Sequence, residues 1–155
     1  MPADHVERDI LIEAPIEVVW EVISHPEHVA RWFSDEAQLD VRPGGDGLLT
    51  WHAMPTSNHP ASFPLRFEAV EPPRRLSYRW CHPGGEEPRT DNSTLVEFTL
   101  TEEGPSTRLR VVESGIQLTS WSQDEKDGFA KSHTDGWERH LEKLRLYAPT
   151  AGAIT

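Results

Sequence analysis

Residues 121–147 read WSQDEKDGFAKSHTDGWERHLEKLRLY, and this stretch decides the architecture expected for the chain. It opens with Ser122 and Glu125 at the Ser-x-x-Glu spacing of a capping box, directly after the hydrophobic Trp121. Apolar and aromatic side chains then recur at offsets of three or four, at Phe129, His133, Trp137, Leu141 and Leu144. This spacing predicts one long helix, running from near Ser122 toward Tyr147, with a single face turned to the core.

Two glycines interrupt this helical pattern, Gly128 and Gly136. Each costs about 1 kcal/mol relative to alanine in a helix interior. We therefore expect another part of the chain to pack closely against the helix backbone at both positions. From Pro149 onward we expect the helix to have ended, which leaves residues 149–155 as a flexible tail.

The chain before this helix has a different periodicity. Residues 6–13 predict a first strand, and residues 16–23 and 27–33 predict two short helices. Short alternating stretches follow as far as about residue 116, separated by glycine and proline, at 48–53, 63–71, 76–82, 95–100 and 107–113. The connections are too short for crossover helices, so the sheet should be antiparallel. The expected class is α+β, with about six to seven strands.

Length and composition restrict the functional classes. A chain of 155 residues with 36% hydrophobic content supports one domain, expected over residues 1–148. Its 26 acidic residues against 15 Lys plus Arg give a net charge of -11, which disfavours nucleic acid and anionic membranes as partners. The chain shows no secretory signal, no membrane-spanning run and a single cysteine, so we expect a soluble, cytoplasmic protein.

Seven short segments stand in order along residues 6–147: Ala14-Pro15-Ile16-Glu17-Val18-Val19-Trp20, Arg31-Trp32-Phe33, Pro43-Gly44-Gly45, Glu71-Pro72-Pro73-Arg74-Arg75-Leu76, Thr107-Arg108-Leu109, Glu113-Ser114-Gly115 and Gly136-Trp137. In this order they resemble the landmarks of bacterial proteins related to the C-terminal domain of the activator of Hsp90 ATPase. That family belongs to the START-like, or Bet v 1-like, helix-grip superfamily. The resemblance implies a curved sheet that grips the long helix around a cavity, which often holds an apolar ligand. One position departs: family members tend to carry Asn where this chain has His133.

A sheet that wraps a helix leaves a pocket wherever its side chains fail to fill the concave side. The candidate ligand-binding residues are those expected to point inward: Trp32, Phe33, Trp51, Phe67, Tyr78, Trp80, Phe98, Val111, Glu113, Phe129, His133 and Trp137. For each aromatic residue the alternative is a plain role in the core, since stripes at these periods are what folding alone requires.

Among these candidates, Glu113 is the one that carries a carboxylate. Alternation with Leu109 and Val111 turns its carboxylate inward, on the same side of the cavity as His133, where it would act as a polar anchor. The alternative is a bulge near Ser114-Gly115 that turns the carboxylate outward to solvent or to an arginine such as Arg79 or Arg110.

Other chemistry has weak support in the sequence. The eight histidines lack the compact spacing of a structural zinc site, so no metal and no cofactor are expected. Cys81 has no neighbouring base in sequence and is interpreted as an inert thiol. No nucleophile elbow, phosphate loop or dinucleotide fingerprint occurs, so no catalytic residue is assigned.

The leading hypothesis is therefore non-catalytic binding of a small hydrophobic or aromatic molecule, such as a lipid or a polyketide-like compound. One alternative is a protein-interaction role with a chaperone contact through Glu86, Glu87, Glu102 and Glu103, which are otherwise simply solvated acids on hairpin loops. A second is an enzyme of the cyclase or dehydratase kind, as in the wider superfamily. In such an enzyme, Glu113 with His133 or Tyr78 would move a proton. The ligand and the oligomeric state stay open.

Overall fold

A computed structural model describes residues 5–52, 61–81 and 87–152. Residues 53–60 and 82–86 fall outside these ranges, including His82, at the end of the strand expected at 76–82, and Glu86, considered for a chaperone contact.

The described chain forms one seven-stranded sheet in which every neighbouring pair is antiparallel. Its strands are β1 (His5–Ile12), β2 (Glu36–Leu39), β3 (Asp46–Trp51), β4 (Ala61–Glu71), β5 (Arg75–Cys81), β6 (Ser93–Glu103) and β7 (Ser106–Ser114). The order across the sheet is β1-β7-β6-β5-β4-β3-β2, so the first strand lies beside the last. The predicted class and strand count are confirmed.

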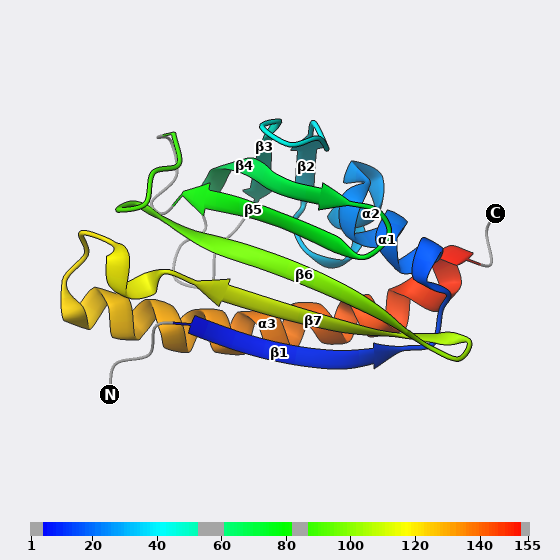
Figure 1. Cartoon of the computed structure of the whole chain (residues 1–155). Helices are drawn as coiled ribbons and strands as arrows, with labels where there is room; N and C mark the ends of the chain where they lie inside the picture. Colours follow the sequence, from blue (N-terminus) through cyan, green and yellow to red (C-terminus); the bar gives the residue numbers. More distant parts are fainter. Residues whose placement is uncertain (1–4, 53–60, 82–86, 153–155) are drawn as a thin grey trace.

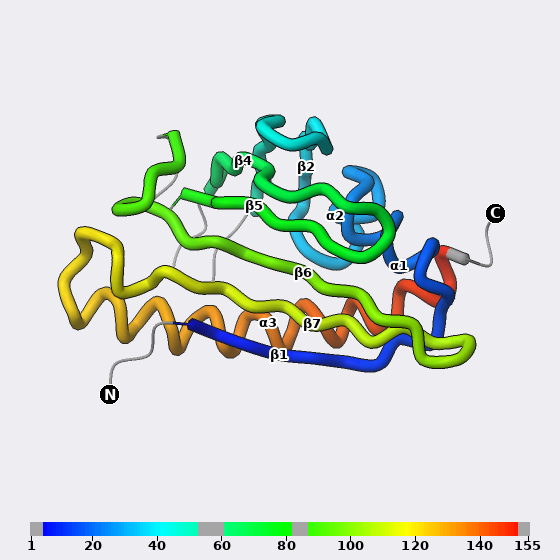
Figure 2. Tube along the Cα trace, viewed as in Figure 1, coloured from blue at the N-terminus to red at the C-terminus, as the bar shows by residue number. Residues whose placement is uncertain are grey.

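Two short helices, α1 (Ile16–Ser24) and α2 (Pro26–Trp32), follow β1, and the long helix α3 (Gln123–Gly152) ends the described chain. Figure 1 shows α3 running along the sheet beside β7 and β1, with α1 and α2 gathered at the end where α3 finishes. The Cα trace of Figure 2 shows that α3 follows β7 and β1 along its whole length. In the same figure, strands β2 to β4 lie at the sheet edge farthest from α3. A single-turn helix, η1 (Ile116–Leu118), joins β7 to α3.

The sequence signals for α3 correspond to real contacts. The Glu125 backbone N–H donates to Ser122 Oγ at 3.1 Å and the Ser122 N–H to the Glu125 carboxylate at 3.2 Å, which completes the predicted capping box. The buried face consists of Ala130, Trp137, Leu141, Leu144, Ala148 and Ala151. The helix is longer than expected, because it continues through Pro149 to Gly152. The expected tail at 149–155 is therefore wrong for residues 149–152, while 153–155 lie outside the described residues.

The sheet bends at β4. Its register with β5 shifts between Phe67 and Ala69, where the Ala69 N–H donates to Ser77 Oγ at 3.0 Å instead of continuing the regular ladder. Such a bulge increases local twist and lets a sheet curve around an element packed on it. The inner face of the curved sheet carries the buried core.

The two glycines of α3 do not have the role that the sequence suggested. A Cβ atom at Gly128 would meet nothing within 4 Å, and one at Gly136 would meet only the Nη2 atom of Arg139, at 3.9 Å. The expectation of a close approach to the backbone is therefore wrong at both positions. The helix is open on these sides, and at Gly136 the open side faces a pocket.

Candidate ligand-binding site

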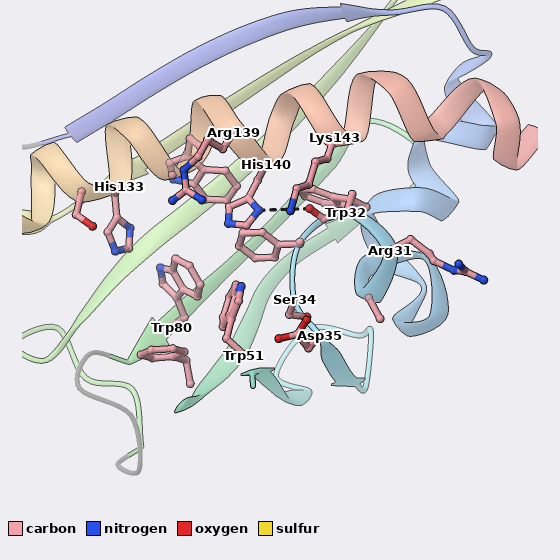
Figure 3. Close-up of a pocket in the computed structure, with 16 residues that line it drawn as sticks. Arg31, Trp32, Ser34, Asp35, Trp51, Trp80, His133, Arg139, His140 and Lys143 are labelled. Carbon is pink, nitrogen blue, oxygen red and sulfur yellow. Dashed lines mark hydrogen bonds between the residues drawn. The ribbon is translucent and has the colours of Figure 1, made fainter. Parts of the chain in front are cut away.

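A pocket of about 510 Å³ lies between α3, the C-terminal end of α2 and strands β3 to β5. This volume is within the range of sites that hold drug-sized molecules. Figure 3 shows its lining, with the helix above and the strand residues below. The lining residues are Ala30, Arg31, Trp32, Phe33, Ser34, Asp35, Trp51, Phe63, Trp80, Ser132, His133, Gly136, Trp137, Arg139, His140 and Lys143.

Aromatic rings form the walls of this pocket. Phe33 stacks on Trp137 with ring centroids 5.2 Å apart and meets Trp51 edge-on at 5.2 Å. Phe63 in turn meets Trp51 edge-on at 5.6 Å. Such geometries are those that aromatic pairs favour. The walls therefore support one another and still present apolar ring surface to the open space.

The polar atoms of two of these walls are held by Glu113, whose side chain is fully buried. Its Oε1 accepts the indole N–H of Trp137 at 2.9 Å, and its Oε2 accepts the indole N–H of Trp80 at 2.7 Å. Thr94 Oγ1 donates to Oε2 at 2.5 Å, and His133 Nδ1 lies 2.7 Å from Oε1. Because a carboxylate only accepts, the imidazole Nδ1 carries the proton in this bond. Glu113 thus orients the residues that form the back of the pocket.

Local sequence explains how Glu113 comes to be buried. In β7 the alternate residues Leu109, Val111 and Glu113 share the inner face, and Glu113 stands opposite Val96 of β6. The strand stays regular as far as Ser114, and only then does Gly115 adopt a left-handed φ of 88°, which starts the turn into η1. The inward orientation on the side of His133 is therefore confirmed, and the alternative of a bulge that exposes the carboxylate is wrong.

His133 connects this buried cluster to the pocket. Its side chain is 16% exposed, lines the pocket and stacks on Phe129 with centroids 3.7 Å apart. The Trp80 ring meets the His133 imidazole edge-on, with ring centroids 5.6 Å apart. One face of the Glu113 cluster is thus a histidine that a bound molecule could touch.

The structure divides the twelve candidate residues into two groups. Six line the pocket: Trp32, Phe33, Trp51, Trp80, His133 and Trp137. The other six do not, and are Phe67, Tyr78, Phe98, Val111, Glu113 and Phe129. Phe67, Tyr78 and Phe98 instead surround a cavity of only about 10 Å³, within the packed core. The two groups meet at Trp32 and Phe33, which line both spaces.

Tyr78 illustrates how apolar this inner region is. Burial, and after it the charge of Glu113, raises the pKa of the Tyr78 phenol well above its usual value of 10.0. The ring lies between Phe67 and Phe98, at centroid distances of 5.9 and 6.2 Å. The phenol is therefore held neutral, away from the pocket lining.

Sequence reasoning missed Phe63 and most of the helix residues in the lining, notably Gly136, Arg139, His140 and Lys143. Burial lowers the pKa of His140 to about 4. The hydrogen bond from His140 Nδ1 to the Trp32 carbonyl, 3.3 Å long, acts to raise this pKa. The positive charges of Arg139 and Lys143 lower it further. A signal did exist. Residues 132, 136, 139 and 143 repeat at offsets of three or four, as a polar stripe beside the apolar one.

Neither a metal-binding cluster nor a membrane-spanning helix is found among the described residues. Within residues 5–52, 61–81 and 87–152, no group of three or more His, Cys, Asp or Glu side chains is placed to hold a metal ion. In the same ranges no helix combines the length and apolar character that crossing a membrane requires. Cys81 is buried.

Comparison with known structures supports the fold. Protein MLL2253 from Mesorhizobium loti superposes with a TM-score of 0.72 at 22% identity, over 92% of this chain and 94% of its own. The Aha1 dimer from Colwellia psychrerythraea gives 0.72 at 15% identity, over 92% and 94%. DynU16, from the dynemicin biosynthetic locus, gives 0.74 at 24% identity, over 96% of this chain and 48% of its own. None of the curated proteins matches the chain.

A curved antiparallel sheet with a long C-terminal helix packed on it defines a helix-grip protein. Residues 13–148 match the family described as activator of Hsp90 ATPase homolog 1-like protein, and the chain belongs to that family. The resemblance drawn from its seven short segments is confirmed.

Proposed function

We propose that the pocket binds a small hydrophobic or aromatic molecule without transforming it. The observation that carries this proposal is an open space of about 510 Å³ walled by aromatic rings. The indole N–H groups of Trp80 and Trp137 turn away from that space, toward Glu113. A ligand therefore meets ring faces, and no buried donor of these two residues is left without its acceptor.

Apolar burial supplies the driving force. At about 25 cal/mol per Å², a ligand that loses about 300 Å² of apolar surface gains about 7 kcal/mol before the cost of association. The whole of that gain would correspond to a dissociation constant of about 10 μM, so after the cost of association we expect an unoptimised aromatic ligand to bind more weakly than this. Lipids and polyketide-like compounds are the classes to examine first. DynU16 shares the fold and belongs to a biosynthetic locus, which supports including the second class.

The test is a titration with N-phenyl-1-naphthylamine, a neutral aromatic dye that fluoresces when it leaves water. Its affinity is compared between two variants of α3, Gly136→Leu and Gly128→Leu. Both positions lie inside the helix and have room for a Cβ atom, but only Gly136 lines the pocket. The two substitutions therefore change helix propensity equally.

We expect wild type and Gly128→Leu to bind the dye with similar affinity. Gly136→Leu should bind about tenfold more weakly or not at all, because the new side chain occupies the pocket. Equal binding by all three proteins, or no binding by wild type, would count against the proposed function. Circular dichroism of each variant verifies that α3 is intact.

A second candidate, proton transfer within the pocket, draws on a specific observation. His133 lines the pocket while its Nδ1 is held 2.7 Å from the buried Glu113 carboxylate, an arrangement that can orient and support a general base. Once a ligand is found, mass spectrometry of that ligand after incubation separates the two functions. Recovery of the unchanged compound supports binding alone, whereas conversion by wild type and its loss in His133→Asn supports catalysis.

The chaperone-contact hypothesis gains no comparable support from the surface acids that suggested it. Glu102 pairs with Arg74 at 3.1 Å and Glu103 with Arg108 at 2.7 Å, and Glu87 lies 3.9 Å from Arg66. These carboxylates already have partners within the chain, as acids on exposed strand ends commonly do.

A further inference from the structure

We propose that the ligand carries an anionic group on its apolar body, and that Arg139 and Lys143 of α3 bind that group at the pocket mouth. The inference rests on the proposed function, because it specifies the chemistry of the molecule that the same pocket would hold. An aliphatic or aromatic organic acid is the class that fits.

Ion pairs are unevenly distributed over the basic residues of this chain. The chain has 26 acidic residues and only 15 Lys plus Arg, so a cation has acids in excess around it. Ten of the 15 form ion pairs with described residues: Arg8, Arg42, Arg66, Arg74, Arg75, Arg79, Arg89, Arg108, Arg110 and Arg145. The five that form no ion pair within the described ranges are Arg31, Lys126, Lys131, Arg139 and Lys143. Three of these five line the pocket.

The side chains of the two cations lie on the pocket side of α3 (Figure 3). Arg139 and Lys143 are one helical turn apart, and Figure 3 shows their side chains extending from α3 on the pocket side, next to His140, while Arg31 extends away. The Arg139 guanidinium lies back over the helix, with Nη2 3.9 Å from the place of a Cβ atom at Gly136. The guanidinium therefore lies beside the open space, at ordinary contact distance from that place.

The charges of the lining residues favour an anion near α3. Asp35 is the one acid among the lining residues that the structure describes, and in Figure 3 it lies on the opposite side from α3. Its Oδ2 already accepts the backbone N–H of His52 at 2.6 Å. His140 lies in the same wall as the two cations, and after burial, which is the main cause, their charges contribute to lowering its pKa. The positive charges that disfavour a proton on His140 favour an anion at the same place.

Together these features define the two ends of a ligand. The aromatic walls take an apolar body, and a guanidinium with an ammonium one turn away takes a carboxylate, sulfonate or similar group. Because the chain as a whole is strongly acidic, such a cationic patch would also orient an anion that is otherwise repelled.

The test uses two dyes with the same aromatic body. N-phenyl-1-naphthylamine is neutral, and 8-anilinonaphthalene-1-sulfonate adds one sulfonate to it. The pocket variant is Arg139→Gln/Lys143→Gln. The control is Lys126→Gln/Lys131→Gln, which removes the same charge from the same helix at residues outside the lining. Affinities of both dyes are measured for wild type and for the two double variants.

We expect the pocket variant to raise the dissociation constant of the sulfonate dye about fivefold or more and that of the neutral dye less than about twofold. The control variant should leave both constants within about twofold of wild type. Equal effects of the two double variants on the sulfonate dye would overturn the inference, since they would indicate a response to net charge alone. Binding of the neutral dye in that case leaves the proposed function standing, whereas failure of both dyes to bind wild type overturns the proposed function as well.

Discussion

Two neighbouring regions of the interior use similar aromatic residues and are filled very differently. Around Phe67, Tyr78 and Phe98 only about 10 Å³ is empty, while around Trp51, Trp80 and Trp137 about 510 Å³ is open. The difference lies in their neighbours. Leucine, isoleucine and valine complete the first region, namely Ile23, Val29, Leu39, Leu49 and Leu65. The second is completed on the helix side by Gly136, a serine and long charged side chains. Aromatic residues alone therefore specify neither a core nor a pocket.

The largest expected effect separates the two regions directly. Phe98 is 1% exposed in the filled region, so Phe98→Ala should lower the free energy of unfolding by about 4 kcal/mol, through lost burial and a new cavity. Phe63 is half-buried at the pocket, and Phe63→Ala should cost only about 1 kcal/mol. Urea unfolding of both variants measures this, and equal losses would contradict the comparison.

Glu113 holds three residues of the pocket wall, and its replacement should have the next largest effect. Glu113→Gln turns an amide NH₂ group toward one of the two indole N–H donors, Trp80 or Trp137, so that buried N–H loses its acceptor and the uncharged amide weakens the other bonds. We expect a loss of about 3 kcal/mol in urea unfolding. The matched control is Glu97→Gln, which breaks an exposed pair with Arg75 and should cost less than about 1 kcal/mol. Similar losses for both variants would contradict a central role for the buried carboxylate.

His140 gives the pocket region a dependence on pH. Its folded pKa of about 4 lies below the unfolded value of 6.5, so the unfolded chain takes up the proton first as the pH falls. The stability contributed by the neutral ring is complete above about pH 6.5 and is lost toward pH 4. Between pH 7 and 5, wild type should lose about 2 kcal/mol more than His140→Asn. Parallel losses in the two proteins would show that His140 is not protected from protonation.

The smallest expected effect concerns the two glycines of α3. Gly136→Ala and Gly128→Ala should each raise the free energy of unfolding by about 1 kcal/mol, because both replace a flexible helix residue where a methyl group has room. If Gly136→Ala were destabilising and Gly128→Ala were not, other atoms would have to pack closer to the Gly136 backbone than the structure indicates. Thermal melts of the two variants, recorded in parallel, provide the comparison.

Local sequence patterns were sufficient to predict most helices and strands and the inward orientation of Glu113. The Ser122–Glu125 capping box predicted where α3 begins, and alternation in β7 predicted that Glu113 turns inward. Both are set by neighbours in sequence, through hydrogen bonds or the period of a strand. The continuation of α3 through Pro149 was not predicted, since buried Ala148 and Ala151 extend its packing beyond the apparent stop signal.

The position of the open space could not be predicted in the same way. It depends on the summed volumes of side chains from α2, α3 and three strands, which no single pattern contains. Phe98 and Trp80 both point inward from neighbouring strands. Only Trp80 lines the pocket, whereas Phe98 lies in the filled region. Arg139 and Lys143 were missed because charged positions beside an apolar stripe ordinarily face solvent. The vacancy at Gly136 turns that side of α3 into a pocket wall.

Entry of a ligand into the open region can be measured directly through the six tryptophans. Trp32, Trp51, Trp80 and Trp137 line the pocket, whereas Trp20 and Trp121 do not. In ¹⁵N-labelled protein the indole N–H signals, assigned by single Trp→Phe variants, can be followed during titration with N-phenyl-1-naphthylamine. We expect saturable shifts for the four lining tryptophans and stationary signals for Trp20 and Trp121. Shifts confined to Trp20 and Trp121, or no saturable shift at all, would contradict ligand entry into the open region.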